Sequence, residues 1–216
     1  MKTGILFDLD GTLLDTLEDL KDAVNYTLSQ YDCPLRSLDE VRSFVGTGAA
    51  NLIRKALPGK ANDPSLEEAL AVYQKYYAAH AQDKTAPYEG IADALKTVCA
   101  RYPVAIVSNK PDIAVKTLCK EYFPGTYALG ETTDCPRKPA PDMVRKAMEA
   151  IGVDTCIYVG DSEVDVLTAQ NAGVPCLSVT WGFRDEKQLK EAGAQHFCED
   201  PAKLADALEA IASKKA

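Results

Sequence analysis

The stretch GILFDLDGTLLDT, residues 4–16, places two aspartates, Asp8 and Asp10, directly after a short apolar run. The apolar residues 4–7 predict a buried strand. A buried carboxylate is costly unless it is paired with a positive charge or coordinates a metal. The stretch therefore indicates a strand that ends in a site for a cation or another charged ligand.

Composition limits the classes of protein to which this chain can belong. Its 216 residues are 46% hydrophobic, and the formal net charge is -8. This size suits one globular domain with a smaller insert, and the negative charge disfavours nucleic-acid and anionic membrane partners. No apolar run approaches the roughly 20 residues of a spanning helix, and no signal pattern precedes the first strand, so we expect a cytoplasmic protein.

Cysteine and histidine usage indicates neither a disulfide framework nor a zinc site. The seven cysteines are dispersed and form no CxxC pair. An odd number of scattered cysteines is typical of reduced thiols. The two histidines, His80 and His196, lie far apart in the sequence, which disfavours a histidine-rich metal centre.

Apolar runs alternate with helical patterns over most of the chain. The runs predict strands at residues 4–7, 104–107, 127–129, 157–159, 177–179 and, more weakly, 196–198. Amphipathic patterns between them predict helices, among them one on which Ile113, Val115, Leu118 and Cys119 share a buried side. This order predicts an α/β fold: a mostly parallel sheet with helices on both faces.

Residues 16–82 break this alternation, because they carry several helical patterns and no convincing strand. Ser37 and Glu40 predict a capping box, and Asp63 and Pro64 predict the start of a later helix. We therefore expect an α/β core domain over 1–15 and 83–216, with a helical domain inserted over 16–82.

Four polar segments follow or lie near strand ends, where parallel sheets bind ligands. They are DLDGT (8–12), SNK (108–110), RKPAPD (137–142) and GDSEVD (160–165). Each has a plain reading as turn or helix-cap chemistry. Their occurrence together favours one common site that contains Asp8, Asp10, Ser108, Lys138, Asp161 and Asp165.

These segments resemble the four signature motifs of the haloacid dehalogenase-like hydrolase superfamily. The likeness covers the whole α/β body, and the helical insert lies where that family has its small helical cap. The resemblance implies a Rossmann-like sheet with the first-motif strand at its centre.

The resemblance also implies a Mg²⁺ site and a covalent nucleophile. Asp8 would attack phosphorus, because a carboxylate nucleophile splits phosphate-ester hydrolysis into two displacements. Asp8, Asp161 and the main-chain carbonyl of Asp10 would bind Mg²⁺, a hard cation that prefers oxygen ligands. Asp165 would bind the ion through water or orient Lys138.

The remaining roles implied are proton transfer and phosphate binding. The Asp10 side chain would protonate the leaving oxygen and then activate water. Ser108 and Lys138 would stabilise the transferring phosphoryl group. The expected substrate-binding residues are Thr12, Thr47, Gly48, Ser108, Asn109 and Lys138.

Two further segments, FVGTGAANLIRKAL (44–57) and SVTWGFR (178–184), resemble phosphoglycolate phosphatases of this family. Thr47 and Gly48 would then face the site when the cap closes. A substrate carboxylate would meet one of three arginines unless these are ordinary surface residues: Arg42, Arg54 and Arg184. Trp181 and Phe183 would line the entrance or pack internally.

A phosphatase acting on a small phosphorylated metabolite, with 2-phosphoglycolate as the leading candidate, is the function we expect. Pyrophosphate, sugar phosphates and nucleoside monophosphates are alternative substrates, and a beta-phosphoglucomutase-like phosphomutase is an alternative outcome. Asp10 disfavours a dehalogenase, which lacks this second aspartate. A phosphonate-cleaving relative would need a cap lysine, for which the candidates are Lys21, Lys55 and Lys60.

A protein of another class, a binding or regulatory protein that has lost catalysis, would have no evident need for Asp8 beside Asp10. The sequence is compatible with a monomer or a homodimer.

Overall fold

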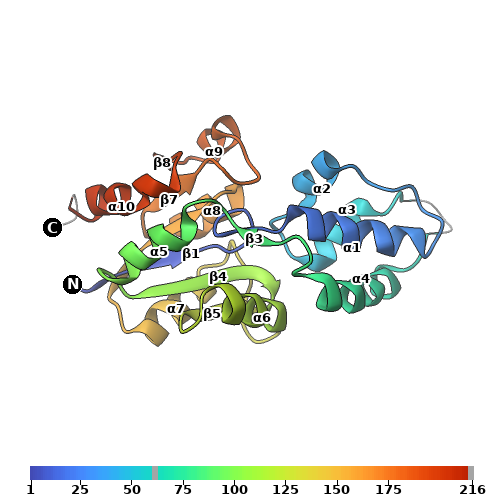
Figure 1. The fold of residues 1–216 in the computed structure, drawn as a ribbon, viewed down its shortest axis with the longest axis horizontal. Helices are drawn as coiled ribbons and strands as arrows, with labels where there is room; N and C mark the ends of the chain where they lie inside the picture. Colours follow the sequence, from blue (N-terminus) through green and yellow to red (C-terminus); the bar gives the residue numbers. More distant parts are fainter. Residues whose placement is uncertain (60–62, 214–216) are drawn as a thin grey trace.

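The computed structural model describes residues 1–59 and 63–213, so the candidate Lys60 lies outside the described residues. Its main feature is a six-stranded sheet in the order β5-β4-β1-β6-β7-β8, in which all neighbouring strands are parallel (Figure 1). The predicted α/β class is thereby confirmed. None of the described helices combines the length and the apolar character needed to cross a membrane.

The helices and strands have the following bounds: β1 Thr3–Phe7, β2 Leu14–Asp15, α1 Leu17–Ser29, α2 Leu38–Phe44, α3 Ala49–Ala56, α4 Leu66–His80, β3 Ala86–Pro87, α5 Ile91–Cys99, β4 Val104–Pro111, α6 Asp112–Tyr122, β5 Tyr127–Glu131, α7 Asp142–Ile151, β6 Thr155–Gly160, α8 Glu163–Ala172, β7 Cys176–Val179, α9 Glu186–Glu191, β8 His196–Cys198, η1 Pro201–Lys203 and α10 Leu204–Ala212. The six predicted strands are all present in the sheet.

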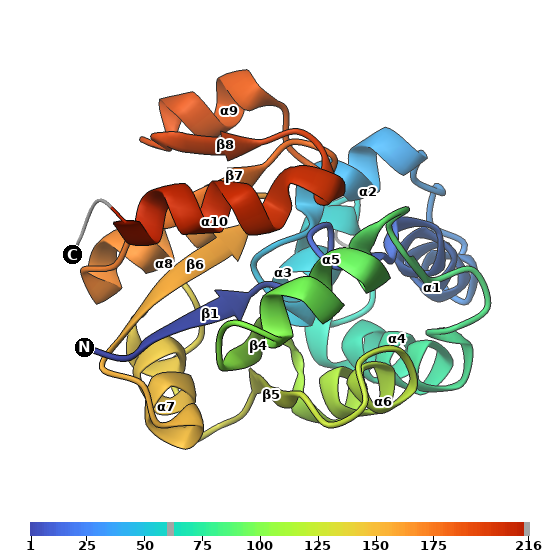
Figure 2. The same cartoon turned by 60° about the vertical axis from the view of Figure 1, so that its left-hand side comes forward.

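Strand β1 lies inside the sheet and is buried on both faces. Ile5 and Phe7 pack with residues of α5, α6 and α10, whereas Leu6 packs on the other face with residues of α7 and α8 (Figure 2). Alternate side chains of a strand point to opposite faces, so both faces of a covered strand must be apolar. The continuous apolar run before Asp8 is explained by this double burial.

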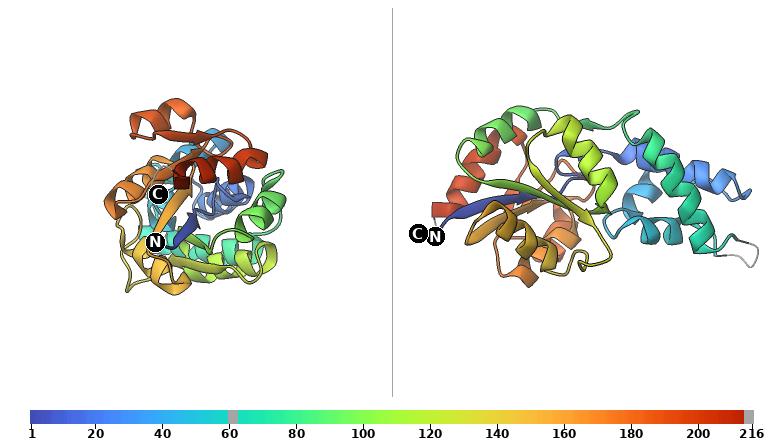
Figure 3. Two further views of the ribbon diagram at one scale, coloured as in Figure 1. Left: turned by 90° about the vertical axis from the view of Figure 1, so that its left-hand side faces the viewer. Right: turned by 90° about the horizontal axis from the view of Figure 1, so that it is seen from below.

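Helices α1 to α4 form a separate layer beside the carboxyl ends of the strands (Figures 1 and 3). Their apolar sides make a core of their own, which includes Leu20, Val24, Ile53 and Tyr73. Two short crossing segments join this layer to the sheet, where β2 pairs with β3 in antiparallel register. We call the α1–α4 layer the cap.

Two helix starts were predicted in the cap. One is present at the expected residues, and the other is shifted along the chain. The capping box of Ser37 and Glu40 is present at α2. The start expected at Asp63 and Pro64 is shifted, because Ser65 caps α4 and forms a capping box with Glu68. A serine followed three residues later by glutamate satisfies two backbone N–H groups at once, which proline before it cannot do.

The expected buried side of α6 was wrong at one residue. Val115, Leu118 and Cys119 are buried, but Ile113 is 83% exposed. At about 100° per residue, Ile113 points away from the direction shared by Val115 and Leu118. Its side chain instead contributes to the rim of the cavity described below.

Candidate active site

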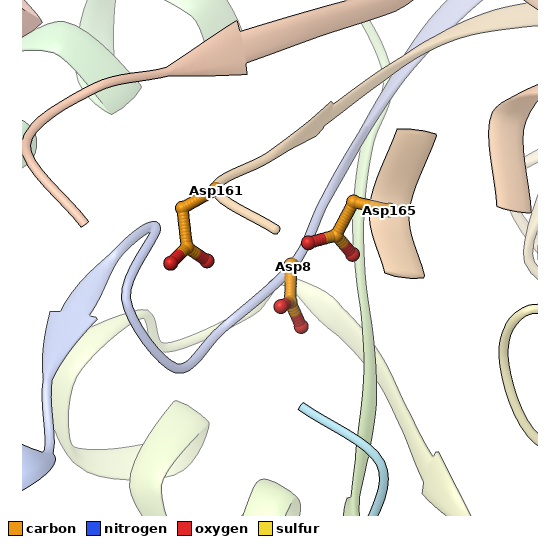
Figure 4. Close-up of side chains that lie close together, drawn as sticks. All are labelled: Asp8, Asp161 and Asp165. Carbon is orange, nitrogen blue, oxygen red and sulfur yellow. The ribbon is translucent and has the colours of Figure 1, made fainter. Parts of the chain in front are cut away.

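Three carboxylates from separate segments converge at the carboxyl ends of β1 and β6 (Figure 4). Asp8 follows β1, Asp161 follows β6, and Asp165 lies in the first turn of α8. One oxygen of each carboxylate lies within 4.8 Å of the others. Neighbouring parallel strands explain this convergence, because their carboxyl ends meet at one edge of the sheet.

Lys138 lies among these carboxylates. Its Nζ is 2.8 Å from Asp8 Oδ1 and 2.8 Å from Asp165 Oδ1, and it donates a hydrogen bond to the Tyr158 hydroxyl at 3.0 Å. Only 3% of the residue is exposed. Burial opposes the charged form, but the carboxylates of Asp165 and Asp8 raise the pKa of Lys138 well above its usual value.

One lysine does not balance three buried acids. Burial raises the pKa of Asp8 to about 7, with the charge of Asp165 adding to the shift and Lys138 opposing it. Burial, Asp165 and Asp8 together raise the pKa of Asp161 well above its usual range. The described residues thus leave excess negative charge in a set of hard oxygen donors, which fits a divalent cation such as Mg²⁺.

Hydrogen bonds hold Asp161 and Asp165 in defined orientations. Thr12 Oγ1 donates to Asp161 Oδ1 at 3.2 Å, and the Phe183 backbone N–H donates to Asp161 Oδ2 at 2.7 Å. Asp165 Oδ2 accepts from both the backbone N–H and the hydroxyl of Ser162. These contacts restrict the carboxylates to the rotamers that face the cluster.

The turn after Asp10 requires glycine. Gly11 has φ +84°, and a Cβ at this position would collide with the Asp161 carboxylate. A side chain is therefore excluded by both the backbone conformation and the close approach of the two motifs.

The carboxyl-terminal half of β4 supplies two of the expected residues. Ser108 is 2% exposed and lines the cavity, and its Oγ accepts from the Lys110 backbone N–H at 3.2 Å. Asn109 binds both backbone polar groups of Lys138, and its Nδ2 also donates to the Gly46 carbonyl of the cap at 3.1 Å. Asn109 thereby links the lysine loop to the cap.

Sequence reasoning missed Lys110, which lies in the same SNK segment. Its Nζ is 2.9 Å from Asp10 Oδ1 and lies over the Tyr77 ring, 4.6 Å from the centroid. The alternation of side chains along a strand could have predicted this position. Lys110 lies two residues after Ser108, and residues two apart on a strand point to the same face. Asp10 Oδ1 also accepts from Thr16 Oγ1 at 2.7 Å.

A cavity of about 360 Å³ lies between the cap and the sheet, and two of the three clustered acids lie in its wall. Asp8, Asp10, Asp161, Ser108, Asn109 and Lys138 line it, as does Gly48 of the cap. Thr12 and Thr47 are not among the lining residues. Thr12 reaches the site through Asp161, and the buried hydroxyl of Thr47 has no hydrogen-bond partner among the described residues.

The SVTWGFR segment contributes both to the cavity wall and to packing between the cap and the core. Phe183 lines the cavity and packs into the cap core, whereas Trp181 packs against the sheet core and donates to the Thr12 carbonyl at 3.0 Å. Arg184 is 7% exposed and donates to Glu163 and to two cap carbonyls, those of Arg42 and Val45. Arg184 thus links the core to the cap through hydrogen bonds.

The other candidate cations lie outside the cavity wall. Arg42 pairs with Asp39 at 2.9 Å, and Arg54 donates to Asn51. Of the lysines considered for imine formation, Lys21 pairs with Glu18 at 2.8 Å, and Lys55 is exposed.

The raised pKa of Asp8 predicts an unusual pH dependence of stability in the metal-free protein. Between the unfolded pKa of 3.8 and the folded pKa of about 7, the folded state binds a proton that the unfolded state has lost. The contribution of Asp8 to the free energy of unfolding should therefore fall as pH rises through this window and level off above pH 7. Each pKa unit corresponds to about 1.36 kcal/mol, so the loss should reach a few kcal/mol.

Urea denaturation in EDTA at pH 5, 6, 7 and 8 measures this slope. Asp8→Asn should make it shallower, and added Mg²⁺ should do the same, since a cation favours the ionised carboxylate. A free energy of unfolding that rises from pH 5 to pH 7 in EDTA would contradict the assignment.

The sequence profile of the haloacid dehalogenase-like hydrolases matches residues 5–179, which include all four motifs. The chain belongs to this family. A phosphoglycolate phosphatase of Pseudomonas aeruginosa is 35% identical over 199 residues, covering 87% of this chain and 72% of the relative. A phosphoglycolate phosphatase of Rhodobacter capsulatus is 34% identical, with coverage of 85% and 87%.

A solved structure from Lactobacillus delbrueckii subsp. bulgaricus has a TM-score of 0.87 and 35% identity over 95% of this chain and 97% of that one. That protein is provisionally assigned as a phosphoglycolate phosphatase. The likeness to haloacid dehalogenase-like phosphatases, inferred from the motifs, is confirmed.

Proposed function

We propose that this chain is a Mg²⁺-dependent phosphatase that hydrolyses a small phosphate monoester through an aspartyl phosphate on Asp8, with 2-phosphoglycolate as the leading substrate. The observation that carries the proposal is the buried cluster itself: three carboxylates within 4.8 Å, with Lys138 2.8 Å from two of them. The phosphoglycolate phosphatases among its relatives support the choice of substrate.

Asp8, Asp161 and the Asp10 carbonyl would hold Mg²⁺, with Asp165 placed to bind it through water. When bound, the ion supplies positive charge that allows a phosphate dianion to approach the acids. Asp165 also accepts from Lys138 at 2.8 Å, so it orients this lysine whether or not it contacts metal-bound water.

In the first displacement, Asp8 attacks phosphorus and the bond from phosphorus to the ester oxygen breaks. The Asp10 carboxyl gives its proton to that oxygen. In the second displacement, water attacks the aspartyl phosphate, Asp10 takes a proton from the water, and the bond from phosphorus to Asp8 breaks. Acid and base roles thus alternate on one residue.

Lys138 and Ser108 would bind the equatorial oxygens of the phosphoryl group, and Asn109 would fix the position of Lys138 through the backbone. Thr12 would act indirectly, by holding Asp161. Thr47 and Gly48 would meet the substrate from the cap. Phosphate-monoester hydrolysis requires accelerations of up to ~10²¹, whereas proton transfer supplies typically ~10²–10⁴. Most of the catalysis must therefore come from the nucleophile, positioning and the positive charges.

The test is release of phosphate by the purified protein from 2-phosphoglycolate, sugar phosphates, nucleoside monophosphates and pyrophosphate, with Mg²⁺ and with EDTA. We expect Mg²⁺-dependent release and the highest kcat/KM for 2-phosphoglycolate. No release from any compound would refute the phosphatase. An isomerised sugar phosphate without release would instead identify a phosphomutase, and a preference for pyrophosphate would identify a pyrophosphatase.

A further inference from the structure

Lys110 is a buried cation that the proposed phosphoryl chemistry does not use. Its side chain is 4% exposed, and its Nζ contacts the acid on which the leaving group depends, Asp10, at 2.9 Å. On the cap side the ammonium lies over the ring of Tyr77, which is on α4. Lys110 therefore lies between the reacting centre and the cap wall of the cavity.

Among the described residues that line the cavity, Lys110 is the cation with free donor capacity. Lys138 donates hydrogen bonds to Asp165 and to the Tyr158 hydroxyl, and it also forms an ion pair with Asp8. Lys110 also has three N–H groups, but Asp10 is its one ion-pair partner among the described residues.

Arg184, the remaining cation of this wall, directs its guanidinium at Glu163 and at the carbonyls of Arg42 and Val45. Moving it to a ligand would remove this donor from those partly buried carbonyls. A second anion in the cavity would therefore bind Lys110 at lower cost than Arg184.

Tyr77 provides an independent indication of a ligand beside Lys110. The residue is 5% exposed and lines the cavity, and its hydroxyl has no hydrogen-bond partner among the described residues. A buried hydroxyl without a partner is costly, and a ligand oxygen would satisfy it. The neighbouring cap wall includes the apolar residues Leu52, Ala78 and Ala81.

The covalent structure of the substrate connects this pair to the reaction. Asp10 must reach the ester oxygen in order to protonate it, and Lys110 contacts Asp10. In 2-phosphoglycolate the carboxylate carbon lies two bonds beyond that oxygen. The carboxylate must therefore lie close to whatever surrounds Asp10 on the leaving-group side.

We propose that the Lys110 ammonium and the Tyr77 hydroxyl form the subsite that recognises the carboxylate of the leaving group. The inference rests on the proposed phosphatase function and makes it more specific, because it assigns the second anion of the substrate to residues of this cavity. The arginines considered from the sequence are not needed for this role, since Arg42 and Arg54 lie outside the cavity wall.

The test compares two substrates that differ at one group. These are 2-phosphoglycolate and 2-hydroxyethyl phosphate, in which a neutral hydroxymethyl group replaces the carboxylate. The readout is the ratio of their kcat/KM values, because damage to Asp10 or to the phosphate site lowers both values and cancels in the ratio. Wild-type protein should prefer 2-phosphoglycolate.

Lys110→Met should lower this ratio about tenfold or more, since it removes a charge-assisted hydrogen bond to the carboxylate. Tyr77→Phe, which removes one oxygen atom, should lower it by a smaller factor, and Lys110→Arg should retain much of it. Lys116→Met is the matched control: this lysine is 64% exposed and pairs with Asp112, so the same loss of charge should leave the ratio unchanged.

Several results would overturn the subsite. An equal loss for both substrates in Lys110→Met would make Lys110 a positioning residue for Asp10 alone. A wild-type enzyme that hydrolyses both esters equally would refute the subsite and leave the phosphatase standing, whereas no Mg²⁺-dependent release from either would refute both. Circular dichroism checks folding, and if Lys110→Met does not fold, the ratios of Lys110→Gln and Tyr77→Phe decide.

Discussion

Asp8→Asn is expected to reduce phosphate release by a factor of about 10⁴ or more, by analogy with the loss of other covalent nucleophiles. The amide has nearly the same shape as the carboxyl but is a poor nucleophile, so no aspartyl phosphate forms. Folding should be retained, because the change removes one of three clustered buried acids and leaves Lys138 paired with Asp165. Steady-state phosphate release and thermal unfolding measure the two effects.

Asp39→Asn is a suitable control for this change. The Asp39 side chain is 85% exposed on the cap and pairs with Arg42, so activity should stay near the wild-type value. Phosphatase activity that survives in Asp8→Asn would contradict the nucleophile. If the wild-type protein has no phosphatase activity and its binding of a partner is retained in Asp8→Asn, the protein is a non-catalytic binding or regulatory protein.

Lys138→Met is expected to cause the largest loss of stability, about 3–5 kcal/mol, because it breaks a buried ion pair by removing one partner. Asp8 and Asp165 would each lose a contact of 2.8 Å, and the Tyr158 hydroxyl would lose its donor. Urea denaturation in EDTA at pH 7.5 measures the effect. Mg²⁺ should restore part of the loss, since it supplies positive charge to the same carboxylates.

Two further variants make this prediction specific. Lys116→Met removes an exposed lysine and should change the free energy of unfolding by less than about 0.5 kcal/mol. Asp165→Asn combined with Lys138→Met should be more stable than Lys138→Met alone, because the double change removes both partners. A loss below about 1 kcal/mol in Lys138→Met would show that the carboxylates do not depend on this lysine.

The strands and the principal acids could be predicted because their signals are local. The run before Asp8 is apolar at every position because β1 is covered on both faces, and burial on both faces appears directly in the sequence. Asp8 and Asp161 end neighbouring strands, so a parallel sheet brings them together once those strands are identified. The capping box at Ser37 is likewise read from two residues three positions apart.

Local signals failed where a residue's environment comes from elsewhere in the chain. Ile113 has an apolar side chain typical of a core residue, but its position on α6 places this side chain at the rim of the cavity. Arg184 resembles a surface arginine in the sequence, yet the docked cap surrounds it with carbonyl acceptors. The environment of Arg184 is not encoded in its neighbouring residues, whereas the direction of Ile113 follows from its helical spacing to Val115 and Leu118.

The sequence by itself determined the α/β class, the family and the aspartates of the GILFDLDGTLLDT stretch. Hydrophobic periodicity, the spacing of the motifs and the residue types can all be read without knowledge of packing. The tertiary structure alone decided which cation Asp8, Asp10 and Asp165 each contact. Lys138 pairs with Asp8 and Asp165, whereas Lys110 pairs with Asp10 beneath Tyr77. The ion pairs join separate segments of the α/β core, so they form only when the sheet and its loops have folded. The contact between Lys110 and Tyr77 also depends on how the cap lies over the ends of the strands.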